Sequence, residues 1–86
     1  MTVQDLKREH PGRVCICRPH LRDGSGRVVS WICLRTAGDV DAARAALERA
    51  EQDGATDAVL ISTTKRITIE GDLAARYYRV FHGMEQ

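Results

Sequence analysis

Three stretches, taken in chain order, decide the fold: Arg13-Val-Cys-Ile-Cys-Arg18, Asp23-Gly-Ser-Gly26 and Arg27-Val-Val-Ser-Trp-Ile-Cys-Leu-Arg35. The first and the last are rich in β-branched, aromatic and sulfur-containing residues, which are typical of strands. The middle stretch is a turn, because aspartate starts turns and glycine tolerates positive φ. We therefore predict an antiparallel β-hairpin that contains these three stretches.

A helix is predicted after this hairpin. Ala37-Gly38 interrupts the strand pattern, Asp39 is a favourable N-cap, and Gly54 stands where a left-handed residue ends a helix, so the helix runs to about Asp53. Small apolar residues recur at helical spacing and leave charged residues on the other face. They are Val40, Ala43, Ala46 or Leu47, and Ala50. Such a narrow stripe lets a helix pack close to a sheet.

The remaining elements follow from the same kind of pattern. Residues 2–9 predict a short helix capped by Thr2, and residues 57–63 predict a third strand with apolar side chains on both faces. Residues 66–70 alternate apolar and polar and predict a fourth strand. A last helix is expected from Leu73 to about His82, with Leu73, Tyr77, Val80, Phe81 and Met84 on its apolar face. The prediction is a single α+β domain of order ββαββα, with a mostly antiparallel sheet and its helices packed on one face.

Size and composition limit the classes of function. The chain has 86 residues, which is room for one domain over residues 1–86 with a leader over 1–12. Its net charge of +1 matches neither the basic excess of a dedicated nucleic-acid binder nor the acidic excess of a DNA mimic. No apolar run is long enough to span a membrane, and the polar start lacks the order of a secretory signal. Three cysteines do not make a disulfide framework, so we expect a reduced, cytoplasmic setting.

The cysteines are also candidate metal ligands. Cys15 and Cys17 lie on one face of the first strand, and Cys33 lies on the second strand, so with His10 or His20 they offer a soft ligand set for zinc. The C-x-C spacing is not that of a zinc knuckle or ribbon. Buried strand cysteines acting as small hydrophobes are the simpler interpretation, and a cysteine–histidine nucleophile lacks a placement that would activate the thiol. We predict no metal, no cofactor and no enzymatic activity.

The candidate partner-binding residues are cationic or aromatic. We predict Arg76, Tyr78 and Arg79 on the exposed side of the last helix, with Lys65 and Arg66 at the preceding turn. Trp31 is either an interface anchor or a cover for the sheet. Direct nucleic-acid binding is an alternative that the balanced charge does not favour. An unpaired edge strand would also permit a homodimer by sheet extension.

One family shares several of these features in order. They are Pro11-Gly12, Arg22-Asp23-Gly24, Val28-Val29, Ala37-Gly38-Asp39 before an alanine-rich helix, and Val59-Leu60-Ile61-Ser62. From Pro11 to about Ile69 the chain resembles a small phage-encoded anti-CRISPR protein, an inhibitor of type I-F surveillance complexes. The resemblance implies a non-enzymatic protein that binds a CRISPR-Cas effector subunit and blocks DNA binding or nuclease recruitment. The segment with Tyr77, Tyr78 and Arg79 departs from that family, so no binding residue is transferred.

A second resemblance points to another class. The run Asp23-Gly-Ser-Gly-Arg-Val-Val-Ser30, followed by Gly38-Asp39 and a helix rich in alanine and glutamate, is similar to the partial RNase-H-like ββα of HicB antitoxins. The chain lacks the Pro-Gly-Cys element that those proteins carry before the helix and lacks a separate DNA-binding tail. A HicB-like antitoxin or a small nucleic-acid-binding regulatory module is therefore the alternative to the inhibitor.

Overall fold

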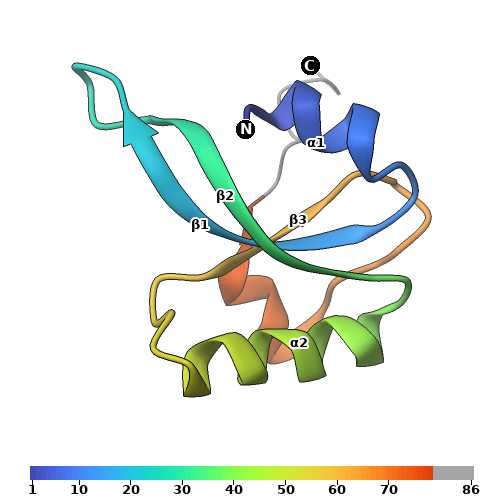
Figure 1. The fold of residues 1–86 in the computed structure, drawn as a ribbon. Coiled ribbons are helices and arrows are strands. Elements are labelled where there is room, and N and C mark those ends of the chain that lie inside the picture. Colours follow the sequence, from blue (N-terminus) through green and yellow to red (C-terminus); the bar gives the residue numbers. More distant parts are fainter. Residues whose placement is uncertain (79–86) are drawn as a thin grey trace.

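The computed structural model describes residues 1–78, with the backbone alone for Tyr78. These residues form seven elements in chain order. They are helix α1 (Val3–Glu9), strands β1 (Val14–Arg22) and β2 (Val28–Ala37), helix α2 (Val40–Gln52), strand β3 (Val59–Ser62), the 3₁₀ helix η1 (Gly71–Arg76) and the short strand β4 (Tyr77–Tyr78). The protein is thus an α+β fold, and its described order differs from ββαββα (Figure 1).

The sheet has the order β2-β1-β3-β4. Strand β1 is antiparallel to both β2 and β3, and β4 runs parallel to β3. The β1–β2 pairing shifts register three times, once between Ile16 and Cys17 and twice near the tip. At the tip, Asp23 Oδ1 accepts the backbone N–H groups of Ser25 and Arg27, and Gly26 has φ of +86°. The predicted hairpin and its turn are confirmed.

Helices cover both faces of the sheet, so the prediction that they pack on one face is wrong. Alternate residues of β1 point to opposite faces, and both sets are apolar. Val14 and Ile16 join the α2-side core with Ala43, Leu47 and Leu73. The α1-side core contains Leu6, Cys15, Cys17, Trp31 and Ile61. In Figure 1 helix α1 lies above the sheet and α2 lies below it.

Local capping signals place the two α-helices where they were predicted. The side chain of Thr2 accepts the Asp5 N–H and the Asp5 carboxylate accepts the Thr2 N–H, which together form a capping box. Asp39 caps α2 by accepting the Ala42 N–H at 2.8 Å. Gly54 follows α2 with φ of +100°, the left-handed conformation expected after a helix.

The segment after β3 differs from its prediction. Residues 66–70 do not form a strand, although Ile67 and Ile69 pack on the α2-side core from an irregular segment. Their alternation therefore reflects two apolar contacts with the core, made without the hydrogen-bonded pairing of a strand. The last helix is also wrong from Leu73 to Tyr78, because the chain makes a 3₁₀ helix and then leaves it at Tyr77 to pair with Leu60. Its expected continuation to His82, with Val80, Phe81 and Met84, lies outside the described residues.

The outer edge of β2 is partly covered by the start of the chain. The Trp31 N–H donates to the Met1 carbonyl at 2.6 Å, and the Met1 nitrogen donates to the Trp31 carbonyl at 2.7 Å. Trp31 itself is 3% exposed, so it covers the sheet and does not serve as an exposed anchor. Within residues 1–78, no helix has the length and apolar content needed to cross a membrane.

Candidate protein-docking surface

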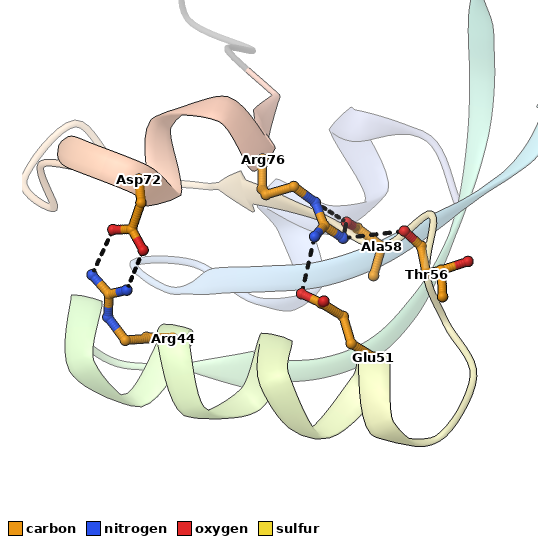
Figure 2. Close-up of polar contacts among 6 residues, drawn as sticks. All are labelled: Arg44, Glu51, Thr56, Ala58, Asp72 and Arg76. Carbon is orange, nitrogen blue, oxygen red and sulfur yellow. Dashed lines mark hydrogen bonds and ion pairs between the residues drawn. The ribbon is translucent and has the colours of Figure 1, made fainter.

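The structure places Arg76 in an intramolecular role. Its guanidinium donates to the Ala58 carbonyl through both Nε and Nη2, to the Thr56 carbonyl at 3.4 Å, and to Glu51 at 2.9 Å (Figure 2). These contacts join η1 to α2 and to the loop before β3. The expectation that Arg76 stands on an exposed helix face is wrong, because the carbonyls it satisfies belong to this chain.

A second arginine completes the attachment of η1. Arg44 of α2 makes a two-pronged contact with Asp72, at 2.8 and 3.1 Å, at the opposite end of η1 from Arg76 (Figure 2). The hydrogen bond from Arg44 lowers the pKa of Asp72, and the same contact raises the pKa of Arg44. Both arginines therefore hold the C-terminal part of the described chain against α2.

The other predicted contact residues do not join Arg76 in one patch. Lys65 and Arg66 are exposed in the turn after β3, whereas Arg76 binds the carbonyl of Ala58, just before β3 begins. A strand of four residues spans roughly 13 Å, so these positions lie at opposite ends of it. The side chain of Tyr78 and all of Arg79 lie outside the described residues. Partner binding by these residues stays a prediction, and those that the structure describes do not share a common surface.

The three cysteines meet on the α1 side of the sheet. Cys15 and Cys17 are fully buried, Cys33 is half-buried, and Cys17 stands directly opposite Cys33 in the β1–β2 register. A hydrogen bond from the Cys17 thiol lowers the pKa of Cys15, and that same bond together with burial raises the pKa of Cys17. Burial raises the pKa of Cys33. Across residues 1–78, no group of three or more histidine, cysteine or acidic side chains has an arrangement suited to a metal ion.

An exposed apolar surface lies on the outer half of the hairpin, which sequence patterns did not reveal. We call it the distal strip; its members are Ile32 and Leu34, which are 45 and 39% exposed, and Leu21 and Val29 nearer the tip are exposed as well. Ile32 pairs with Arg18, two residues from Ile16, and so lies on the α2 side of the sheet. Figure 1 shows that the hairpin reaches beyond the end of α2. The strip is therefore apolar sheet surface that α2 is too short to cover.

A shallow pocket of about 260 Å³ adjoins the strip where α2 ends. It is lined by Arg18, Leu34, Arg35, Ala50, Asp53 and Ala55. Arg18 is held by Asp57 at 2.7 Å, and this hydrogen bond lowers the pKa of Asp57. Arg35 is only 3.9 Å from Asp53, which Arg49 also approaches at 3.6 Å. The lining of the pocket thus combines apolar side chains with charged ones.

The charge around the strip is locally basic. Between residues 13 and 37 the sequence carries five arginines and one aspartate, although the whole chain has a net charge of only +1. Apolar side chains surrounded by arginine are typical of protein–protein interfaces, where arginine is enriched and lysine is depleted. Ile32 and Leu34 would individually be unremarkable on a surface, but together beside the pocket they make this face a candidate docking surface. Comparison with protein-family models, curated proteins and solved structures finds no match to this chain.

Proposed function

We propose that the protein is a non-enzymatic inhibitor that binds a type I CRISPR-Cas effector subunit and blocks DNA binding or nuclease recruitment. The observation that supports a binding role is the distal strip, an exposed apolar surface beside a pocket on a locally basic hairpin. The choice of a CRISPR effector rests on the sequence resemblance from Pro11 to about Ile69.

The chemistry of the strip favours a protein partner over a nucleic acid. Phosphate binding depends on cationic side chains, and exposed leucine and isoleucine add little to its free energy. Burial of these apolar side chains against a protein partner, in contrast, stabilises the complex. Two of the hairpin arginines are already paired with acids of this chain, Arg18 with Asp57 and Arg35 with Asp53. Arg22 and Arg27 add positive charge near the tip. The partner surface should therefore have an apolar centre and acidic residues around it.

The test is recovery of the effector by tagged protein after nuclease treatment, with purified type I effector complex as the probe. The variant I32T/L34T removes apolar surface and keeps residues that suit strands. If both side chains are buried at the centre of the interface, their loss costs at least about 2 kcal/mol, or roughly 30-fold in affinity. The variant I32D/L34D should bind no better. The matched control A42D/A45D adds two acids on the exposed face of α2 and should bind like the wild type.

Each outcome points to a different conclusion. Retained binding by I32D/L34D would exclude the distal strip as the contact surface while leaving the inhibitor in place. Failure of the unmodified protein to recover effector subunits would refute the inhibitor. Recovery of a small ribonuclease from a host lysate would instead favour the antitoxin, and salt-sensitive recovery of nucleic acid alone would favour a regulatory module.

A further inference from the structure

Cys17 and Cys33 form a cross-strand pair of free thiols. They are Cα partners on the antiparallel strands β1 and β2, and all three cysteines of the chain are reduced. Directly opposed residues of antiparallel strands have Cα atoms about 4.5–5.5 Å apart, and disulfides span about 4.4–6.8 Å. The strand pairing therefore already brings these two residues within the range of a disulfide.

The third cysteine is excluded from this pairing by register. Cys15 stands opposite Thr36. Cys15 and Cys17 lie two residues apart on the same strand, where the backbone keeps their Cβ vectors nearly parallel and so unsuited to a disulfide. Access further separates the thiols. Cys15 and Cys17 are 0% exposed, whereas Cys33 is half-buried. An oxidant from solvent therefore reaches Cys33 first, and the residue directly opposite it across the strands is Cys17.

We propose that Cys17 and Cys33 form an oxidisable dithiol that a hydroperoxide converts to an intramolecular disulfide. The Cys33 thiolate attacks one peroxide oxygen, the O–O bond breaks, and the sulfur becomes a sulfenic acid as the other oxygen leaves as water or an alcohol. The Cys17 sulfur then attacks the Cys33 sulfur and displaces the hydroxyl, which leaves as water with the Cys17 proton. Two thiols are oxidised by one peroxide. This modification is independent of the proposed docking function.

The environment of the thiols determines the rate of each step of this oxidation. The nucleophile is the thiolate, and burial raises the pKa of Cys33, so its thiolate fraction at neutral pH is small. The first step is therefore slow. Once the sulfenic acid forms, Cys17 is held opposite it and competes well with a second peroxide molecule. The structure thus favours a disulfide over further oxidation of Cys33.

The experiment treats the native, reduced protein with hydrogen peroxide at neutral pH, blocks free thiols with an alkylating agent, and maps the products by mass spectrometry without reduction. The expected product has lost two hydrogen atoms and contains a peptide pair joined through Cys17 and Cys33. Addition of dithiothreitol should restore the original mass. The matched variants are C15S, which keeps the pair, and C33S, which removes the accessible partner without changing a fully buried position.

The wild type and C15S should form the disulfide to similar extents, and C33S should form none. The variant C17A, which keeps a small apolar side chain in the core, should accumulate irreversibly oxidised Cys33. A disulfide that includes Cys15, or oxidised Cys33 without a cross-link in the wild type, would overturn the proposal. So would a disulfide that appears only after urea has unfolded the chain, as shown by the fluorescence of buried Trp31.

Discussion

Replacing Arg76 tests whether this residue holds the fold together or serves as an exposed contact. The variant R76M removes the guanidinium and keeps most of the apolar stem. The Ala58 carbonyl then loses its charged donor, and Glu51 loses its ion-pair partner. Because these contacts join η1 to the rest of the protein, we expect R76M to destabilise the native state while the fold is retained.

The magnitude follows from the contacts. Hydrogen bonds to charged groups contribute roughly 1.5–3 kcal/mol, and the bond to the partly buried Ala58 carbonyl belongs to this class. The pair with Glu51 adds roughly 0–1 kcal/mol, because Glu51 is 41% exposed. Arg76 is itself 31% exposed, which lets water replace part of what is lost. We expect a total loss of about 2–3 kcal/mol, or a fall in Tm of roughly 10–20 °C for a domain of this size.

The assay is urea unfolding followed by circular dichroism, with R66M as the matched control. Arg66 is exposed in the turn after β3, so the same chemical change there should alter the free energy of unfolding by less than about 0.5 kcal/mol. If R76M and R66M have the same free energy of unfolding, the guanidinium contacts contribute nothing and the structural role assigned to Arg76 is refuted. Lost binding by an Arg76 variant would not by itself identify an interface, because the same change destabilises the native state.

Three further predictions concern capping, backbone conformation and pH. The variant D39A should lose about 1 kcal/mol of stability in urea unfolding, because a first-turn N–H of α2 loses its acceptor; an unchanged midpoint would contradict the cap. The variant G54A should lose about 1 kcal/mol, because its φ of +100° strains any side chain. G24A, also in open space but without positive φ, should lose less, and equal losses would contradict this cause. Stability should also fall on acidification. Arg18 lowers the pKa of Asp57 below the unfolded value of about 3.9, so its stabilisation is complete above that pH and is lost as pH falls through the folded pKa. D57N should show a shallower loss in acid titrations of unfolding, and an identical acid limb would refute the contribution.

Local signals explain which elements the sequence could predict. The turn at Asp23 and the cap at Asp39 act through neighbouring residues, so the hairpin and α2 follow from short stretches. The segment after β3 depends instead on distant contacts. Ile67 and Ile69 alternate as in a strand, but the partly buried Ile67 and the buried Ile69 pack against the α2-side core without a partner strand. Likewise, the sequence alone indicates that Arg76 is a surface residue, because its contact with the Ala58 carbonyl depends on the folded chain.

The distal strip could not be predicted because its position depends on one extra residue in β2. Ile16 pairs with Arg35, but the next pair is Cys17 with Cys33, so Leu34 is skipped in the ladder. A register shift of one residue reverses which face each following side chain occupies. Without this bulge Leu34 would lie opposite Cys17 on the α1 side.

The same bulge therefore produces both features proposed here. By skipping Leu34, it leaves that side chain against the pocket beside α2, where it is 39% exposed. It also turns Trp31 into the α1-side core and sets Cys33 opposite Cys17. Bulges typically redirect side chains near functional surfaces. The proposed binding surface on one face and the thiol pair on the other are thus positioned together by one backbone irregularity, although the two proposals are tested separately.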